Sequence, residues 1–275
     1  MKSMKKLLFV AILALVVIVS VGACSAGFLD FLGGDSSSAD ANTTGEVNLA
    51  AAASLKNAFD KDLIPLFNEK YPGIKVTPTY ASSGDLQTQI ENGLKADIFM
   101  SAANKQMNAL AEKGLVDNGT NVQFLENKVV LIVPKDSTLN ITSFDDLKNV
   151  NGTIAIGDPE SVPAGQYAQE ALNNTGLWKT VEPKLSLGTD VTAVLNQVAQ
   201  GSADCGIVYA TDAKSNDDVK VVCEAPDNAL KTPVIYPIAM IKDSNNTDAA
   251  KAFMDFLQTQ EAKDIFVEYG FTIHE

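Results

Sequence analysis

The strongest constraint on the fold is an alternation of strand-like and helix-like segments that begins at residue 46. The segment "EVNLAAA" precedes "SLKNAFDKDLIPLFNEKY", "IKVTPTY" precedes "SSGDLQTQIENGL", and "ADIFMSA" precedes "NKQMNALAEKG". The first helical segment carries apolar residues at helical spacing, namely Leu55, Phe59, Leu63, Leu66 and Phe67. Repeated βα units of this kind predict an α/β fold with a mostly parallel sheet flanked by helices.

A second series of such units begins with "KVVLIVPK" and continues to "VKVVCEA". The number of units predicts two α/β lobes. The apolar segments "VVLIVP" and "VIYPIAMI" are interpreted as the strands at which the chain passes between the lobes. Lobe I is therefore predicted to comprise residues 46–128 and 234–275, and lobe II is predicted to be an insertion of residues 129–233. Two lobes joined by two short crossings predict a hinge, with a ligand cleft between the lobes.

The first 45 residues indicate export. Residues 1–23 combine three lysines with an apolar run from Leu7 to Val21, which is typical of a signal peptide. "VGAC" resembles a lipobox, so Cys24 is predicted to carry a lipid; ordinary cleavage near Ala23 is the alternative. Residues 24–45, rich in Ser, Gly, Asp and Asn, are predicted to tether an extracytoplasmic body to the outer face of the cell membrane.

The charge balance is strongly acidic. The net charge is −13, and removal of residues 1–23 takes away three lysines and no acids, which gives a mature charge of −16. Such a surface repels nucleic acid and anionic lipid headgroups. We therefore expect no nucleic-acid partner, membrane contact only through the N-terminal anchor, and a monomer.

Two absences narrow the chemistry further. All 21 basic residues are lysines, so no bidentate arginine clamp can hold a carboxylate or phosphate. His274 is the only histidine and lies one residue from the C-terminus, which argues against a Ser-His-Asp triad, a Cys-His pair or a histidine-rich metal site. Cys205 and Cys223 fit either a disulfide or two small buried residues, and their spacing leaves both open.

Four strand-to-helix junctions share one physical character. Ser54 is predicted to be a helix N-cap, and Ser82 and Ser83 likewise, with Gly84 allowing close backbone approach. Pro163 is expected in a first helical turn, which leaves the amides of Ala164 and Gly165 exposed. The segment "GTDVTAVL" is expected to start a fourth helix, with Asp190 or Thr189 as its cap and Val191 in its first turn.

Helix N-termini that converge on one point can hold an anion without any charged side chain. Their first N–H groups have no intrahelical partner, and the helix dipole places partial positive charge there. Each junction alone is also explained as an ordinary cap. The anion site therefore depends on all four acting together.

The ordered set of motifs resembles one known family. The segments "AAASL", "YASSG", "QIENGLKADIFMSA", "GDPESVPAGQYAQEAL", "GTDVTAVLNQVAQGSADCGIVYATDA", "YPIAM" and "IFVEYGFT" resemble the molybdate-binding proteins of ABC transporters over about residues 46 to 273. The resemblance implies the two-lobed type II periplasmic-binding-protein fold. It also implies a receptor that takes molybdate, and tungstate as well, to a membrane permease and its ATPase, without a cofactor.

The resemblance also implies a ligand set, carried over motif by motif. The implied oxyanion contacts are Ser54, Ser83, Ala164, Val191 and Tyr209, where the last has the alternative of a core tyrosine at a strand end. Gly84 stands where some relatives carry a third serine. Related tungstate receptors with six-coordinate metal use two carboxylates, and the matching positions here are Val162 and Tyr209, so molybdenum is expected only within an intact tetrahedral anion.

Two other functions remain open at the level of the sequence. One is catalysis, by Ser82 or Ser83 as a nucleophile or by the carboxylates of Asp97 and Asp158, although no histidine or neighbouring lysine supports the serines. The other is a receptor for sulfate or another tetrahedral oxyanion. The sequence favours the molybdate receptor and no enzyme.

Overall fold

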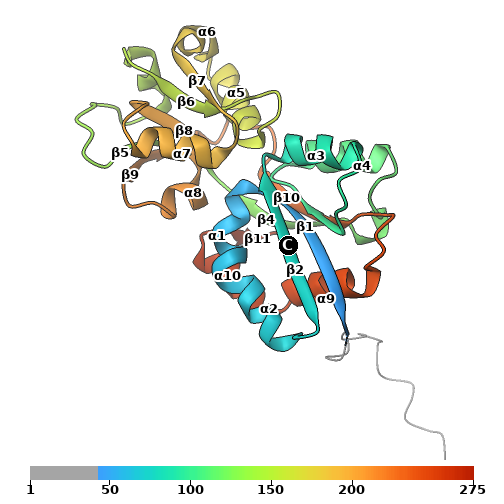
Figure 1. The fold of residues 1–275 in the computed structure, drawn as a ribbon. Helices are drawn as coiled ribbons and strands as arrows, with labels where there is room; N and C mark the ends of the chain where they lie inside the picture. The colour runs from blue at the N-terminus through green and yellow to red at the C-terminus, as the bar shows by residue number, and fades with distance from the viewer. Residues whose placement is uncertain (1–42) are drawn as a thin grey trace, which may run out of the picture. The chain divides into compact units, whose positions relative to one another are not determined.

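The computed structural model describes residues 43–275, which lie in one compact unit. The predicted signal peptide, Cys24 and all but the last three residues of the predicted tether lie outside the described residues. The described chain forms two β-sheets flanked by helices (Figure 1). The predicted two-lobed α/β fold class is confirmed.

The first sheet has six strands in the order β11-β4-β10-β3-β1-β2. Their bounds are β1 (Gly45–Ala52), β2 (Ile74–Ala81), β3 (Ile98–Met100), β4 (Val122–Asn127), β10 (Val234–Met240) and β11 (Thr272–Ile273). Strand β1 is parallel to β2 and β3, whereas β10 is antiparallel to β3 and β4. The sheet is mixed rather than mostly parallel, because the strand that returns after the second lobe runs in the opposite direction.

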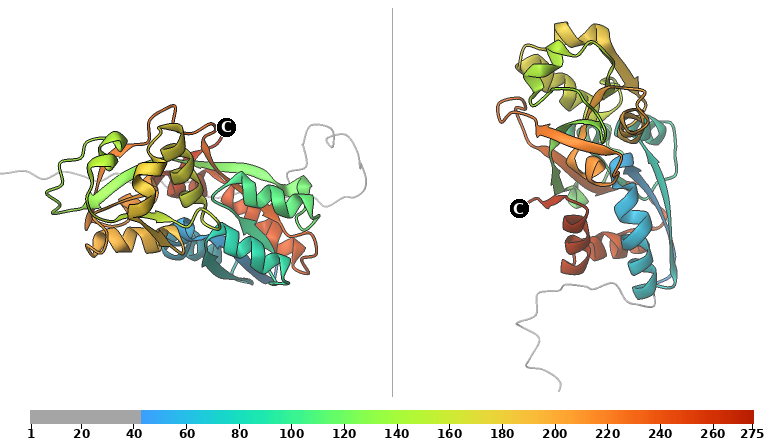
Figure 2. Two further views of the ribbon diagram at one scale, coloured as in Figure 1. Left: turned by 90° about the horizontal axis from the view of Figure 1, so that it is seen from above. Right: turned by 90° about the vertical axis from the view of Figure 1, so that its left-hand side faces the viewer.

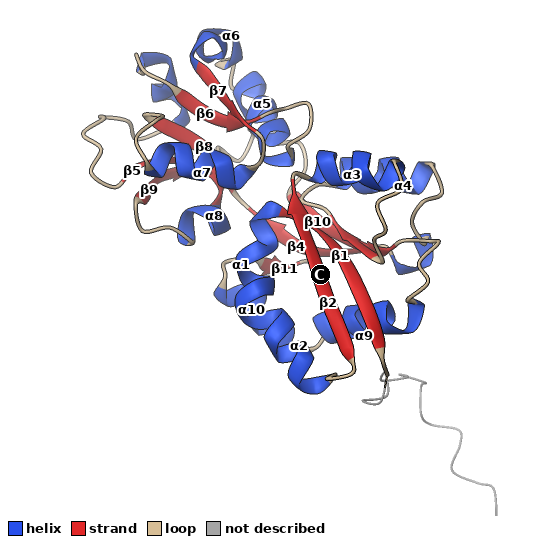
Figure 3. Cartoon of the chain, in the orientation of Figure 1, coloured by secondary structure: helices blue, strands red, loops and turns tan. Residues whose placement is uncertain are grey.

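Helices cover both faces of this sheet (Figure 3). They are η1 (Ala53–Leu55), α1 (Lys56–Ala58), η2 (Phe59–Leu63), α2 (Ile64–Lys70), α3 (Ser83–Glu91), α4 (Asn104–Glu112), η3 (Asn118–Thr120), α9 (Thr247–Leu257) and α10 (Gln260–Glu268). Successive residues of a strand point to opposite faces. Accordingly, Leu49 belongs to the core with Phe59 and Phe253, while Ala50 belongs to a second core with Leu86 and Met107.

The first predicted helical segment is formed, but it is irregular. Between α1 and α2 the chain makes a π-helical turn over Phe59–Leu63. Pro65 follows within the first turn of α2 and has no N–H to donate to the preceding turn. The widened turn accommodates the missing hydrogen bond and still keeps Phe59 and Phe67 fully buried.

The second sheet has five strands in the order β7-β6-β8-β5-β9. Its strands are β5 (Val129–Pro134), β6 (Ile154–Gly157), β7 (Leu185–Gly188), β8 (Cys205–Tyr209) and β9 (Val219–Glu224). Its helices are η4 (Phe144–Asn149), α5 (Pro163–Asn174), α6 (Trp178–Val181), η5 (Glu182–Lys184), α7 (Val191–Ala199) and α8 (Ala210–Lys214). Strand β6 is parallel to β7 and β8, and β5 is antiparallel to β8 and β9, so this sheet is mixed as well (Figure 2).

Neither strand that was expected to pass between the lobes does so. Strand β5 pairs only within the second sheet, and β10 pairs only within the first. Strand β4 ends at Asn127 and β5 begins at Val129, so the chain changes sheet at Lys128. It returns through residues 225–233. Backbone groups in a strand need partners along one sheet, so the change occurs where pairing stops.

The possible disulfide between Cys205 and Cys223 is not formed, and both thiols are free. The two residues lie on β8 and β9, which are separated by β5; Leu131 of β5 pairs with Ile207 on one side and with Cys223 on the other. Adjacent strands are about 4.8 Å apart, so two strand spacings exceed the roughly 7 Å that a disulfide can bridge between Cα atoms. Burial raises the pKa of the Cys205 thiol to about 12, which keeps it protonated.

Across residues 43–275, no helix has the length and apolar character needed to span a membrane.

Candidate functional site

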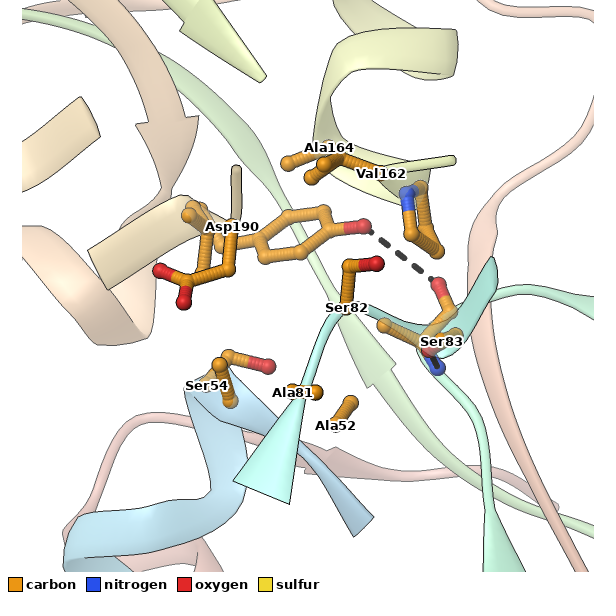
Figure 4. Close-up of a pocket in the computed structure, with 13 residues that line it drawn as sticks. Ala52, Ser54, Ala81, Ser82, Ser83, Val162, Ala164 and Asp190 are labelled. Atoms are coloured by element: carbon orange, nitrogen blue, oxygen red, sulfur yellow. Dashed lines mark hydrogen bonds between the residues drawn. The ribbon is translucent and has the colours of Figure 1, made fainter. Parts of the chain in front are cut away.

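The parallel strands bring the predicted junctions together. Ala52 and Ala81, the last residues of β1 and β2, are paired neighbours, and so are Gly157 and Gly188, the last residues of β6 and β7. Parallel strands present their carboxyl ends at one edge of a sheet, where ligands of α/β proteins bind. The segments that follow these ends line a single cavity (Figure 4).

All five residues implied by the family resemblance line this cavity. The lining consists of Ala52, Ala53, Ser54, Ala81, Ser82, Ser83, Ala102, Val162, Pro163, Ala164, Asp190, Val191 and Tyr209. The empty volume is about 210 Å³, mouth included. The enclosed part of the cavity has room for little more than one water-sized group, so the cavity is suited to a small ligand rather than a drug-sized organic molecule.

The first turn of α3 shows how the "SSG" sequence is used. Ser82 is the N-cap, and its Oγ accepts a hydrogen bond from the Asp85 N–H at 3.1 Å. The Gly84 N–H donates to the Ser161 carbonyl oxygen, in the loop before α5, at 2.9 Å. Ser83 is the first helical residue, whose N–H has no partner within the helix. Of the first three amides of α3, that of Ser83 is thus left for a ligand.

Helices α5 and α7 contribute their first amides from the second lobe. Pro163 occupies the first position of α5, as predicted, so Ala164 carries the first N–H of this helix. Asp190 is the N-cap of α7, and its Oδ1 accepts from the Ala193 N–H at 2.8 Å. Val191 is therefore the first residue of α7, with its N–H free of intrahelical bonding. These two amides and that of Ser83 belong to three different helix starts on one cavity.

Ser54 does not cap a helix, contrary to the prediction. It lies inside the short η1 helix, whose N-cap position is held by Ala52 without a side-chain hydrogen bond. Its Oγ instead lies 2.9 Å from the Tyr236 hydroxyl, a residue of β10. A capping serine would turn its oxygen toward its own backbone, whereas Ser54 keeps its hydroxyl at the cavity wall.

Tyr209 lies at the end of β8, is 1% exposed and lines the cavity. Its hydroxyl donates a long hydrogen bond of 3.4 Å to the Ala102 carbonyl oxygen. Burial raises the pKa of this phenol well above its usual value of 10.0, so the group stays a hydrogen-bond donor. Tyr209 is thus both a core tyrosine and a cavity residue, and the two interpretations do not compete.

The cavity wall contains no lysine and a single carboxylate, that of Asp190. The Asp190 carboxylate caps α7, and Figure 4 shows it pointing away from Ser82 and Ser83. Within residues 43–275, no group of three His, Cys, Asp or Glu side chains is placed to hold a metal ion. Apart from Asp190, the polar side chains of the cavity lining are the hydroxyls of Ser54, Ser82, Ser83 and Tyr209, which can donate hydrogen bonds.

The residues of the catalytic alternative do not assemble. Asp97 is buried outside the cavity, where it accepts hydrogen bonds from the Asn48 N–H and side chain, from Ser244 and from Asn246. Asp158 also lies outside the cavity lining. His274, the only histidine, contacts Glu126 at 2.6 Å and is not a cavity residue. Within residues 43–275, neither a histidine nor a lysine therefore lines the cavity beside Ser82 and Ser83.

Sequence reasoning missed three residues that shape the site. Ala102 bridges two cavity side chains, because its N–H donates to Ser83 Oγ at 3.0 Å and its carbonyl accepts from Tyr209. The sequence contained a signal for Ala102, because the segment "ADIFMSA" places this residue just after a predicted strand, as at the other junctions. Tyr236 and Asn127 lie behind Ser54, and their role depends on long-range pairing that no local pattern reveals.

Asp212 is a buried carboxyl group near the cavity. It is 5% exposed, and its Oδ2 has no hydrogen-bond partner among the described residues. Burial, together with the nearby Asp190, raises its pKa from 3.8 to about 8, despite an opposing hydrogen bond with the Tyr209 backbone. The folded protein therefore retains a proton on Asp212 that the unfolded chain releases at lower pH.

The proton retained on Asp212 in the folded state makes the free energy of unfolding depend on pH. Between the unfolded pKa near 3.8 and the folded pKa of about 8, the unfolded chain binds fewer protons than the folded one. The free energy of unfolding should therefore fall as the pH rises through this range. In Asp212→Asn, which stays neutral, urea unfolding should show a smaller decline than the wild type between about pH 5 and pH 8. Equal declines in the two proteins would contradict the assignment.

The chain matches known solute-binding proteins over nearly all of the described part. Residues 47–272 match the family model described as bacterial extracellular solute-binding protein. The putative ABC transporter substrate-binding lipoprotein YvgL of Bacillus subtilis is 36% identical, with 95% of this chain and 96% of that protein covered. The molybdate-binding protein ModA of Escherichia coli is 41% identical, covering 83% and 90%.

A solved structure leads to the same family. The substrate-binding domain of a putative molybdenum ABC transporter from Clostridium difficile is 40% identical, with a TM-score of 0.65, and the match covers 84% of this chain and 99% of that one. Identity at this level over the full length of a relative is a family relationship and more than a shared fold. The chain belongs to the bacterial extracellular solute-binding proteins and, among them, to the family of molybdate-binding proteins of ABC transporters.

Proposed function

We propose that this protein is an extracytoplasmic receptor that binds molybdate as an intact tetrahedral dianion and delivers it to an ABC importer. One observation carries the proposal: a small cavity is lined by hydroxyl groups and first-turn amides from both lobes, with no lysine, and its one carboxylate, that of Asp190, caps α7. The donors are the first amides of α3, α5 and α7 and the hydroxyls of Ser54, Ser83 and Tyr209, the last of which would exchange its long bond to the Ala102 carbonyl for one to the anion. Hydrogen bonds to an ionised acceptor are about twice as strong as neutral ones, so fixed dipoles replace the missing arginine.

A wall of donors also selects the ligand by its protonation state. Monohydrogen phosphate carries a proton that needs an acceptor, whereas molybdate, tungstate and sulfate are fully ionised near neutral pH. An unpaired proton in a closed cavity costs roughly 1–3 kcal/mol, or about tenfold to a hundredfold in affinity. Tungstate has the same shape and charge as molybdate and is expected to bind as well. A receptor for sulfate or another tetrahedral oxyanion is the second candidate, and competition among the anions separates the two.

Ligand capture is proposed to involve closure of lobe II (residues 129–233) on lobe I (residues 46–128 and 234–275). Two hydrogen bonds connect the lobes: the Gly84 N–H donates to the Ser161 carbonyl, and Gln106 Nε2 donates to Gln166 Oε1 at 3.2 Å. The hinge would consist of Lys128 and residues 225–233. Exclusion of water on closure strengthens each hydrogen bond to the anion.

The proposed setting is the outer face of the cell membrane. The related YvgL is described as a lipoprotein, which supports a lipid on Cys24 after cleavage of residues 1–23. The protein would act as a monomer that hands the anion to a permease and its cytoplasmic ATPase. The proposed role is binding and delivery of the anion, which agrees with the family of extracellular solute-binding proteins.

Calorimetric titration with molybdate, tungstate and sulfate tests this function. We expect one-to-one binding that is tightest for molybdate or tungstate. Ser83→Ala and Tyr209→Phe should each reduce molybdate affinity by about tenfold to a hundredfold, since each removes one charge-assisted hydrogen bond. Tyr80→Phe is the matched control, because the Tyr80 hydroxyl bonds Asp60 outside the cavity.

The possible outcomes test the receptor function and the assignment of the binding residues separately. Absence of heat with all three anions would refute an oxyanion receptor. Preference for sulfate would replace molybdate by the second candidate. If the wild type binds molybdate and the molybdate affinities of both variants stay within about threefold of the wild-type affinity, the assigned contacts are wrong, although the receptor function stands.

A further inference from the structure

A chain of buried polar side chains lies behind Ser54 and has no place in the proposed ligand set. Tyr236 is fully buried on β10, and Asn127 is 9% exposed at the end of β4. Neither residue lines the cavity. Buried polar groups are costly unless their hydrogen bonds are made, so the directions of these bonds are informative.

The orientation of the Asn127 amide is fixed by the backbone. The Lys128 N–H donates to Asn127 Oδ1 at 2.9 Å. A flipped amide would place an NH₂ group against this N–H, two donors facing each other. The Nδ2 group therefore points the other way, where it donates to Thr211 Oγ1 at 2.9 Å and to the Tyr236 hydroxyl oxygen at 3.2 Å.

The Tyr236 hydroxyl must then donate to Ser54. A phenol has one proton, and Asn127 Nδ2 offers no lone pair to accept it. Ser54 Oγ, at 2.9 Å, is the other hydrogen-bond partner of this hydroxyl among the described residues. Ser54 Oγ is thus an acceptor toward Tyr236, and its own proton is left for the cavity that Ser54 lines.

Ser83 is held in the same way by a different partner. Its Oγ accepts the Ala102 N–H at 3.0 Å, a backbone donor that cannot reverse its role. The Ser83 proton is likewise left for a ligand. In both serines a protein donor takes one of the two lone pairs of the oxygen, so the hydroxyl proton is left for the ligand and only one lone pair could accept a proton from a bound anion.

On the basis of the proposed oxyanion receptor, we propose that Tyr236, oriented by Asn127, is a positioning residue that fixes Ser54 as a hydrogen-bond donor to the anion. The relay from Lys128 N–H through Asn127 and Tyr236 to Ser54 makes the site selective against tetrahedral oxyanions that carry a proton. Selectivity thus depends on a residue that does not touch the ligand.

The test compares dianions of equal charge that differ in one proton. At mildly alkaline pH, molybdate and sulfate are unprotonated dianions, whereas arsenate is mainly the monohydrogen dianion. Dissociation constants for the three anions are measured by calorimetry or by competition against molybdate. The readout is the preference of each protein for its best unprotonated anion over hydrogen arsenate, because a general loss of structure would weaken both anions alike.

Tyr236→Phe removes the relay and keeps the ring, which packs on Tyr209 and Phe271 at centroid distances of 5.7 and 5.3 Å. Without the donated proton, Ser54 is free to accept, so we expect the preference over hydrogen arsenate to fall by about tenfold. Tyr167→Phe is the matched control, since that buried hydroxyl interacts with the Ile235 backbone rather than with a cavity residue. It should leave the preference unchanged.

A double-mutant cycle with Ser54→Ala tests whether Tyr236 changes the anion preference through Ser54. If Tyr236 acts through Ser54, adding Tyr236→Phe to Ser54→Ala should not change the preference further. An equal loss for protonated and unprotonated anions in Tyr236→Phe, or a shift that persists without Ser54, would overturn the relay while leaving the receptor function intact. A wild type that binds none of the three anions would overturn the proposed function and the relay together.

Discussion

A Gly84→Ala variant should fold normally and bind molybdate about 100-fold more weakly than the wild type. Gly84 is in the first turn of α3, and a Cβ there would overlap the Ser161 carbonyl oxygen and lie 2.8 Å from the Ser161 Cα. Ser161 belongs to the other lobe, and both colliding groups are backbone. The two lobes must therefore stay apart, although each can fold.

The expected loss follows from the ligand contacts that need both lobes. With α3 held away from α5, the amides of Ala164 and Val191 no longer reach an anion held by Ser54 and Ser83. Loss of even two charge-assisted hydrogen bonds, at about 1.5 kcal/mol each, corresponds to roughly a hundredfold. Calorimetry gives the affinity, and small-angle scattering with and without molybdate reports closure, which should occur in the wild type alone.

Gly114→Ala is the control for a general effect of replacing a glycine. Gly114 has a φ of 69° after α4, with open space around it. Alanine there costs about 1 kcal/mol of stability through backbone strain and leaves the Gly84–Ser161 contact between the lobes unchanged. This variant should be less stable than Gly84→Ala and bind molybdate like the wild type. Normal affinity of Gly84→Ala would show that closure does not need the Gly84–Ser161 approach.

A Gly165→Ala variant should lose both stability and affinity. Gly165 is in the first turn of α5, and its Cβ would overlap the Gly157 carbonyl oxygen at the end of β6 and lie 3.0 Å from the Asp158 carbonyl carbon. Here the clash lies within one lobe, so opening the lobes does not relieve it. Helix α5 must shift away from β6, at a cost of about 3 kcal/mol.

The shift also moves the anion-binding end of α5. Ala164 precedes Gly165 in the same turn, so the Ala164 N–H would no longer point at the cavity. Urea unfolding measures the stability, and calorimetry measures molybdate affinity, which should fall by more than about tenfold. Gly176→Ala, just beyond the other end of α5 at a φ of 74° with open space, should cost about 1 kcal/mol and keep the affinity. Equal stabilities of the two variants would contradict the tight packing of α5 on β6.

Much of the fold and of the cavity lining was predictable because local patterns specify helix starts and strand ends. The alternating units, the position of Pro163 at the start of α5 and Asp190 as the cap of α7 are all local features, and the structure has them. The proposed ligand set came from ordered motifs, and its five residues line one cavity. Ser54 as a helix cap was wrong, since the same serine in a short η1 helix bonds a distant tyrosine instead.

By itself the sequence determined which chemistry was available. A chain with no arginine and with its one histidine next to the C-terminal residue has no guanidinium clamp for an anion, while its strand–helix junctions offer hydroxyl and amide donors. Only the tertiary structure decided how those donors are aimed. The Ser54 hydroxyl takes its direction from Tyr236, 182 residues away, and Gly84 is required by the approach of Ser161 from the other lobe. Such contacts depend on strand register and lobe packing, for which periodicity along the chain carries no signal.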